Sequence, residues 1–188
     1  MEATNYEIRD LLPTKHDIDF LTTMVYIAHY PTRSPIPNAT IASHIPQVFL
    51  WVDQWGEKGD IALIAQRGDR FLGAACYRLF SVRDQVAGFL SEQTPVLVLA
   101  VLPQYRRQGV GCRLLTTLIQ RAKDASFPAL SLTVSMRNPA IALYEQVGFH
   151  SVQISEELLV TMRKPLAFSN NTRSLPASIT TRHLHQAC

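Results

Sequence analysis

The sequence predicts one α/β domain built around a mixed sheet. Segments with strand periodicity and segments with helix periodicity alternate along the chain. The strand expected at 96–102 (VLVLAVL) is apolar on both faces, which is typical of a central, covered strand. A chain of 188 residues is long enough for one well-buried domain and too short for two of comfortable size.

The first quarter of the chain predicts one strand and two helical stretches. Polarity alternates over residues 5–9, as in a short strand. Thr14 is a suitable N-cap for a helix whose apolar residues recur at helical spacing, namely Ile18, Leu21, Met24, Val25 and Ala28. A loop with three prolines ends this helix. A second helical stretch is expected over 39–52, with an interruption near Pro46.

The remaining elements follow in the order of an α/β sandwich. Turn residues at 56–60 precede two strands, 61–66 and 71–80, which a Gly-Asp turn joins. A polar loop, 81–94, leads to the central strand. The elements after it are a helix at 110–126, a strand at 129–135, a helix at 139–147 and two short strands at 149–153 and 158–163. This order predicts a mixed sheet with helices packed on it.

Composition excludes several classes of protein. The net charge is only +3 and the basic residues are scattered, apart from Arg106–Arg107, so we expect no nucleic-acid partner. The polar N-terminal decapeptide and the short apolar runs predict no secretory signal and no membrane span. Three widely separated cysteines, Cys76, Cys112 and Cys188, argue against a disulfide framework and for a reducing compartment. We therefore predict a cytoplasmic protein.

The composition changes at the C-terminal end. Residues 165–188 are rich in Ser, Thr, Asn and Arg and contain no acidic residue, which predicts a flexible tail after a domain at 1–164. His183 and His185 form a pair without a third ligand, so no metal site is predicted there.

The turn after the central strand predicts an anion site. Arg106-Arg107-Gln108-Gly109-Val110-Gly111 follows that strand and opens an amphipathic helix. The glycines let backbone approach a ligand closely, and the first N–H groups of a helix are unpaired and electropositive. The two arginines add charge at the same place.

Two nucleotide-binding motifs do not fit this turn. A dinucleotide fingerprint requires a third glycine where Leu114 stands, and no acidic residue closes the strand at 129–135. The Gly-Lys-Ser/Thr of a phosphate-binding loop is absent from the chain.

A second segment, 134–149, predicts a short capped helix. Asn138 is a good N-cap, Pro139 suits the first helical position, and Gly148 is the expected glycine after the last turn. Tyr144 falls on the apolar stripe, where a tyrosine is by itself more often a core residue than a catalytic one.

Together the two segments resemble the GNAT superfamily of N-acetyltransferases. The shared residues are Arg106-x-x-Gly109-x-Gly111 and, about thirty residues later, Asn138-Pro139-Ala140-x-x-Leu143-Tyr144-x-x-x-Gly148-Phe149. The resemblance covers roughly 5–163 and is specific from about 95 to 150. It implies a GNAT-type mixed central sheet of about six to seven strands with helices on both faces. It also implies acetyl transfer from acetyl-CoA, without a metal, directly to an amine of a small molecule or protein.

The resemblance also assigns roles to particular residues. The backbone of Leu99, Ala100 and Val101 would pair with the pantetheine arm, and Asn138 would lie beside the cofactor. Tyr144 would stand near the thioester sulfur as general acid, where a phenol can protonate the departing thiolate. The pyrophosphate would be held by the segment Arg106, Arg107, Gln108, Gly109, Val110, Gly111 and Cys112, chiefly through its amides.

One feature of the family is missing. Many members place a glutamate, which deprotonates the amine, at the positions held here by Val96 and Thr133. The nearest upstream carboxylates are Asp84 and Glu92, and Glu92 could act through a water molecule. The missing glutamates keep two alternatives open. The chain could be an acyl-CoA-binding module with little or no catalysis, or it could transfer a different acyl group.

The acceptor side carries no diagnostic motif. His29, Tyr30, Trp51 and Trp55 fall where the family builds its acceptor pocket, and Tyr77 and Arg78 could reach it. Aromatic residues of this kind are more often packing residues. The identity of the amine and the oligomeric state, a homodimer being one option, are left open.

Overall fold

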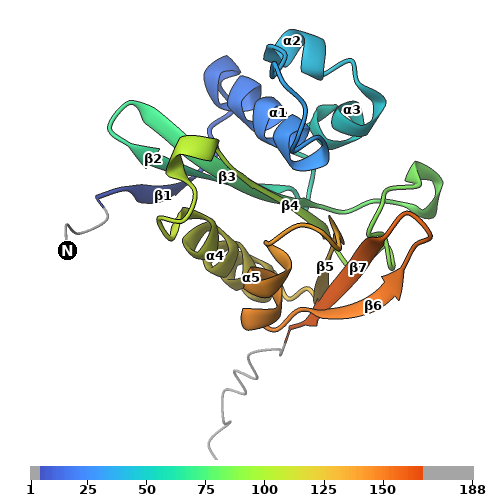
Figure 1. Cartoon of the computed structure of the whole chain (residues 1–188). Coiled ribbons are helices and arrows are strands. Elements are labelled where there is room, and N and C mark those ends of the chain that lie inside the picture. Colours follow the sequence, from blue (N-terminus) through green and yellow to red (C-terminus); the bar gives the residue numbers. More distant parts are fainter. Residues whose placement is uncertain (1–4, 167–188) are drawn as a thin grey trace, which may run out of the picture.

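The computed structural model of the chain describes residues 5–166, which form a seven-stranded mixed sheet with helices on both faces (Figure 1). The strands lie in the order β1-β2-β3-β4-β5-β7-β6. Their bounds are β1 Glu7–Asp10, β2 Ile61–Arg67, β3 Arg70–Arg78, β4 Val96–Val101, β5 Ala129–Ser135, β6 His150–Ile154 and β7 Leu159–Pro165. The predicted fold class is confirmed, and the elements follow one another along the chain in the predicted order.

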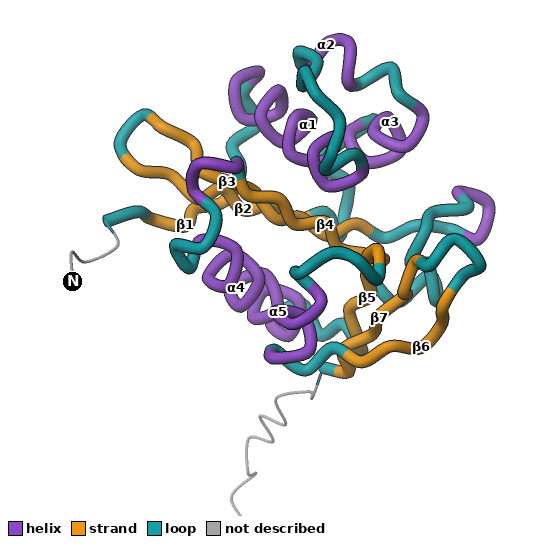
Figure 2. Tube along the Cα trace, in the orientation of Figure 1, coloured by secondary structure: helices purple, strands orange, loops and turns teal. Residues whose placement is uncertain are grey.

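The helices divide between the two faces of the sheet. Figure 2 shows α1, α2 and α3 on one side and α4 and α5 on the other. The helix bounds are α1 Lys15–His29, α2 Ala39–Ala42, α3 Pro46–Val52, α4 Val110–Asp124 and α5 Ile141–Gln146. Short 3-10 turns at Val82–Asp84 and Pro103–Tyr105 flank β4.

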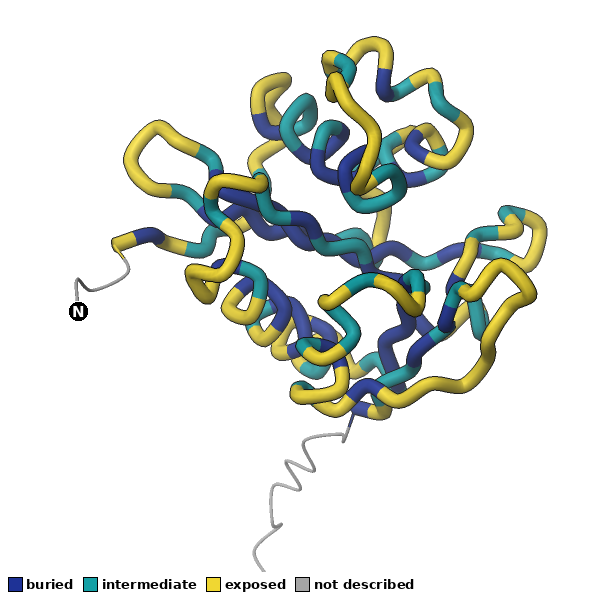
Figure 3. Tube along the Cα trace, in the orientation of Figure 1, coloured by how far each residue is buried: buried dark blue, intermediate teal, exposed yellow. Residues whose placement is uncertain are grey.

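The central strands are buried from both sides, as their apolar sequence predicts (Figure 3). Side chains of β4 alternate between two cores. Leu97 packs in the cluster beneath α4, whereas Val96 and Ala100 pack in the cluster beneath α1 and α3. The two faces of β4 are therefore covered by different helices.

The two halves of the sheet separate between β4 and β5. β4 pairs with β3 along its whole length, from Gly73↔Val101 to Arg78↔Val96. Its parallel pairing with β5 is confined to Val96↔Ser131. Beyond that pair the two strands share no register, so they form a fork that opens toward their carboxyl ends.

Local signals explain most helix boundaries. The Thr14 hydroxyl accepts a hydrogen bond from the Asp17 N–H, as predicted for the N-cap of α1. The stretch predicted at 39–52 is divided at Pro46, because proline fits the first position of a new helix and cannot continue an earlier one.

The predicted N-cap of α5 is wrong. α5 begins at Ile141 with Ala140 in the cap position. Asn138 instead closes a turn in front of the helix, since its Oδ1 accepts from the Ala140 N–H at 2.9 Å. Its carbonyl also accepts from the Ile141 N–H. Asparagine stabilises this side-chain-to-backbone turn as readily as a helix cap, so the local sequence does not distinguish the two.

None of the helices within residues 5–166 is long and apolar enough to cross a membrane. β7 runs to Pro165, and Leu166 is buried in the core. The rest of the predicted tail, with His183 and His185, lies outside the described residues.

A buried ion pair joins α1 to the sheet edge. Arg9 of β1 donates to Asp17 through Nη1 at 2.6 Å and Nη2 at 3.0 Å, and the Leu12 N–H donates to the same carboxylate at 2.8 Å. The Asp17 side chain is only 3% exposed. The hydrogen bond from Arg9 is the main cause that holds the pKa of Asp17 below its ordinary value of 3.8.

We expect Asp17→Asn to lower the free energy of unfolding by ~2–3 kcal/mol at pH 7, because it leaves the Arg9 guanidinium without its charged partner. A lowered carboxyl pKa stabilises the fold above the unfolded value and is lost as the pH falls. The difference between variant and wild type should therefore shrink below pH 3.8. Urea unfolding at several pH values measures it.

Asp19→Asn on the same helix is the matched control. Asp19 pairs with Lys15 on the surface, with side chains 44% and 81% exposed, so its loss should change stability by less than ~0.5 kcal/mol. Equal effects of the two substitutions would show that the Arg9–Asp17 pair is not stabilising.

Candidate active site

The fork exposes one edge of β4. The Leu102 N–H donates to the Leu72 carbonyl on β3 at 2.9 Å, and the backbone groups of successive strand residues point to opposite edges. Ala100 therefore directs its backbone to β3, whereas Leu99 and Val101 direct theirs to the fork. Of the three strand residues predicted to pair with a pantetheine arm, only Leu99 and Val101 offer backbone groups there.

One of these groups already has a partner. Arg106, just past the strand, folds back so that its Nε donates to the Val101 carbonyl at 3.0 Å. This contact leaves the terminal nitrogens of the exposed guanidinium free of any hydrogen bond within residues 5–166. The positive charge of Arg106 is thereby held at the mouth of the fork.

A basic loop follows at the carboxyl end of β4. Arg107 and Gly109 both have left-handed backbone, with φ of 61° and 78°, and residues 106–109 are exposed. α4 begins immediately afterwards, with no side-chain cap and no acidic residue in its first turn. Left-handed residues next to an uncapped helix start turn several N–H groups toward one point, which is the geometry of an anion-binding nest.

Gly111 lies where three elements meet. A Cβ at this position would lie 3.5 Å from the nearest Val101 side-chain carbon and 3.8 Å and 3.9 Å from those of Leu143 and Leu99. The start of α4 thus rests on the end of β4 and on α5. The next residue, Cys112, is an exposed free thiol.

Asn138 stands at the carboxyl end of β5, the other arm of the fork. Its N–H donates to the Ser135 carbonyl at 2.8 Å, and its Oδ1 is used by the Ala140 N–H. The side-chain NH₂ makes no hydrogen bond within the described part of the chain. It remains available as a donor beside the fork.

Tyr144 is buried on the inner side of α5. It is 6% exposed and packs edge-on against Phe149, with ring centroids 5.9 Å apart. Burial raises the pKa of its phenol to about 12, so the hydroxyl stays protonated at neutral pH. Among residues 5–166 the hydroxyl has no hydrogen-bond partner.

No carboxylate occupies the family's usual base positions. Val96 begins β4, and Thr133 on β5 faces Thr161, with 3.4 Å between their hydroxyl oxygens. Glu92 lies in an exposed turn in front of β4, closed by a hydrogen bond from the Thr94 N–H to the Ser91 carbonyl. Its carboxylate forms no ion pair with another residue that the structure describes.

Some of the aromatic residues expected on the acceptor side lie together. The ring of His29, at the end of α1, lies 6.2 Å from that of Trp51 on α3 and 6.4 Å from that of Tyr30. Trp51 is 2% exposed and packs on Phe80, so it is a core residue. His29 and Tyr30 are only partly buried and remain accessible.

The other three candidates, Tyr77, Arg78 and Trp55, are held by other contacts. The Tyr77 side chain is completely buried in the core beneath α4, on the opposite face of the sheet. Arg78 holds the loop after α3, donating to the carbonyls of Trp51 and Asp53 and pairing with Asp60 at 3.5 Å. Trp55 lies under the same guanidinium, 6.0 Å away. Sequence spacing cannot reveal the contacts of Arg78, because its partners lie at residues 51–60, far from it along the chain.

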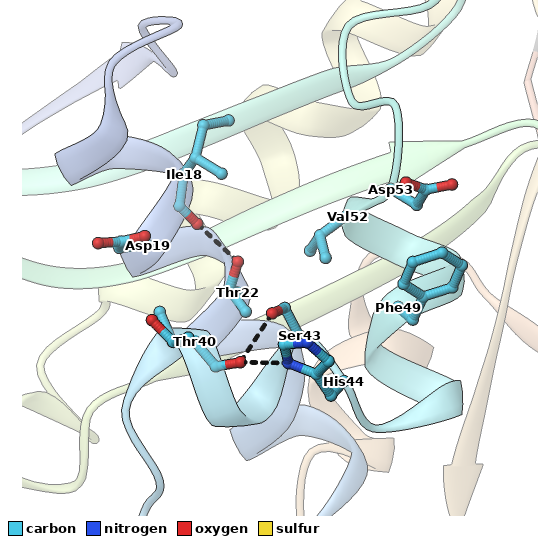
Figure 4. Close-up of a pocket in the computed structure, with 10 residues that line it drawn as sticks. Ile18, Asp19, Thr22, Thr40, Ser43, His44, Phe49, Val52 and Asp53 are labelled. Carbon is cyan, nitrogen blue, oxygen red and sulfur yellow. Dashed lines mark hydrogen bonds between the residues drawn. The ribbon is translucent and has the colours of Figure 1, made fainter.

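Figure 4 shows a hollow of about 380 Å³ among α1, α2 and α3, apart from the fork. Two of its hydroxyl groups donate to nearby backbone carbonyls. The Thr22 hydroxyl donates to the Ile18 carbonyl, and the Ser43 hydroxyl donates to the Thr40 carbonyl. It shares no residue with the fork or with the basic loop. Residues 5–166 also contain no group of three or more side chains that could hold a metal ion.

Comparison with known proteins places the chain in a family. The sequence model of the acetyltransferase (GNAT) family matches residues 28–149, about two thirds of the chain. The chain therefore belongs to the acetyltransferase (GNAT) family, as the two sequence motifs predicted.

Relatives with assigned names share the same region. The probable N-acetyltransferase san of Drosophila melanogaster is 30% identical over 103 residues, which cover 54% of this chain and 53% of the fly protein. The [ribosomal protein bS18]-alanine N-acetyltransferase of Escherichia coli K12 is 32% identical over 106 residues, which cover 53% of this chain and 67% of that protein. The chain thus spans about half to two thirds of the length of these relatives.

The fold agrees with solved structures. YncA, a putative acetyltransferase from Salmonella typhimurium solved with its cofactor acetyl-CoA, superposes with a TM-score of 0.61 at 19% identity. The match covers 94% of this chain and all of that one. At this identity the likeness shows the fold.

Proposed function

We propose that this protein transfers an acetyl group from acetyl-CoA to an amine. The observation that carries the proposal is the unpaired edge of β4, which leads from Leu99 and Val101 directly to the basic nest at Arg107–Gly109. An extended amide-bearing arm that ends in a diphosphate complements both parts. The names of the fly and E. coli relatives, and the acetyl-CoA bound to YncA, support the same ligand and reaction.

The described residues divide the work of binding and reaction. The loop Arg106 to Cys112 would hold the diphosphate, and Asn138 would donate to the arm from the other side of the fork. A backbone N–H on the open edge of β4 would stabilise the negative charge that develops on the thioester carbonyl oxygen. Alignment of acetyl-CoA and the amine in the fork would lower the activation free energy by roughly several kcal/mol, as in other reactions of two substrates.

The reaction requires two proton transfers. The amine nitrogen attacks the carbonyl carbon, the carbon–sulfur bond breaks, and the sulfur leaves as a thiolate. We propose Tyr144 as the acid that protonates this thiolate, because its buried phenol stays protonated. The proton lost by the amine needs an acceptor, for which Glu92, acting through water, is the carboxylate candidate.

A protein amine is the acceptor class that we propose first. The E. coli relative is named for an alanine of ribosomal protein bS18. A small-molecule amine is the second candidate. The remaining alternatives are transfer of a longer acyl group and binding of acyl-CoA without turnover.

Release of free CoA tests the proposal. We expect the full chain, mixed with acetyl-CoA and a panel of peptide and small-molecule amines, to release CoA at least 100-fold faster with its preferred amine than without one. Butyryl-CoA in the same assay tests the choice of acyl group. Tight acetyl-CoA binding without acceptor-dependent CoA release across the panel would contradict enzyme function and favour the binding module.

A further inference from the structure

His29 is held in one tautomer by its own helix. Its Nδ1 lies 2.9 Å from the Val25 carbonyl oxygen, and a carbonyl oxygen can only accept a hydrogen bond. Nδ1 must therefore carry the proton of the neutral ring, which leaves the lone pair on Nε2. No group within residues 5–166 forms a hydrogen bond with Nε2.

The surroundings keep this ring neutral. Burial lowers the pKa of His29 below its ordinary value of 6.5 and outweighs the opposing hydrogen bond to Val25. Aromatic rings face it, from Tyr30 on the following residue and Trp51 on α3. Arg33 stacks on the Tyr30 ring, with its Cζ 4.7 Å from the ring centroid, and no described carboxylate pairs with His29.

His29 lies at the end of α1, on the face of the sheet opposite to Tyr144. α1 packs across β4, and the cluster beneath it joins Trp51 and Phe80 to Val96, the residue at which the fork opens. Tyr144 belongs to the other cluster, beneath α4. The phenol of Tyr144 and the imidazole of His29 therefore lie on opposite faces of the sheet that contains β4.

The geometry points to Nε2 of His29 as the base that takes the proton from the acceptor amine. This inference rests on the proposed function. The amine approaches from the α1 face, its nitrogen bonds to the thioester carbon, and its proton moves to Nε2. The imidazolium passes that proton to solvent, while the thiolate takes the Tyr144 proton, which solvent then replaces. An imidazole can deprotonate the amine in this protein, in which Val96 and Thr133 replace the glutamates that many family members use.

The test is the pH dependence of kcat/KM for wild type, His29→Gln and Glu92→Gln. Wild type should lose activity as the pH falls through a value below 6.5, because the lowered pKa keeps the imidazole unprotonated above it. An α-amine acceptor titrates at about 7.7–8.0 and gives a separate limb. His29→Gln should lower kcat about 100-fold, remove the acidic limb and leave the Kd for acetyl-CoA unchanged.

His44→Gln is the matched control, because the Nδ1 of His44 also lies near the carbonyl four residues earlier, that of Thr40 at 2.7 Å, but this histidine is exposed and lies apart from the fork. Its pH profile should equal that of wild type. Loss of the acidic limb in Glu92→Gln, with its persistence in His29→Gln, would assign the base to Glu92 and overturn the inference. Absence of turnover by wild type would overturn the proposed function and the role of His29 with it.

A measurement that does not depend on turnover is the nitrogen NMR spectrum of the His29 ring in the free protein. We expect the Nδ1–H tautomer and a pKa below 6.5. A ring protonated on Nε2 at neutral pH would be incompatible with the role of base.

Discussion

Gly109→Val should weaken acetyl-CoA binding by about 100-fold or more, which corresponds to roughly 2.7 kcal/mol. Gly109 has φ of 78°, a conformation that valine adopts only at a cost of ~1–3 kcal/mol. The side chain itself has room, since the Tyr6 hydroxyl oxygen, 3.9 Å from the Cβ position, is the nearest atom. The loop would relieve the strain by rotating its N–H groups away from the diphosphate. Isothermal titration with acetyl-CoA measures the loss.

Gly68→Val is the control that separates the cost of backbone strain from the loss of the diphosphate-binding geometry of the 106–112 loop. Gly68 lies in the β2–β3 turn with φ of 55° and no atom within 4 Å of its Cβ position. Gly68→Val should lose about as much stability as Gly109→Val and keep the wild-type Kd for acetyl-CoA. If Gly109→Val bound acetyl-CoA as tightly as wild type, the 106–112 loop could not be the diphosphate site.

Tyr144→Phe should lower kcat about 100-fold or more while leaving the Kd for acetyl-CoA within about twofold of wild type. The substitution removes the only proton that the phenol can give to the thiolate and keeps the packing against Phe149. Since burial raises the phenol's pKa to about 12, wild type should show no loss of activity from its ionisation up to pH 9 or so. Steady-state rates and titration on the same preparations measure both effects.

Tyr77→Phe is a matched control for this substitution. Tyr77 is also buried, and burial also raises its phenol pKa to about 12. Its hydroxyl has no hydrogen-bond partner in the described part of the chain, residues 5–166. Removing that hydroxyl should leave kcat unchanged and raise stability by up to ~1–2 kcal/mol. A parallel fall of kcat and affinity in Tyr144→Phe would mean that Tyr144 is a packing residue.

The structure changes the interpretation of several residues that the motifs had singled out. Asn138 and Ala140 were expected in a helix cap and in the helix, yet both precede α5, because an asparagine side chain closes a turn as well as it caps a helix. Arg78 was expected near the acceptor and instead holds the loop after α3. His29 was expected only as one of several aromatic neighbours. Its tautomer depends on the Val25 carbonyl, four residues earlier, which composition does not show.

By itself, the sequence determined the fold class, the succession of strands and helices along the chain, the family and the basic glycine loop at 106–112. These features depend on residues that are consecutive or regularly spaced, so their physics is local: a period of two or 3.6, a cap, or a glycine with left-handed backbone. The tertiary structure alone decided which groups face the fork. The exposure of Leu99 and Val101, but not of Ala100, depends on which edge of β4 pairs with β3. The placement of Tyr144 and His29 on opposite faces depends on how helices far apart in the chain pack on one strand.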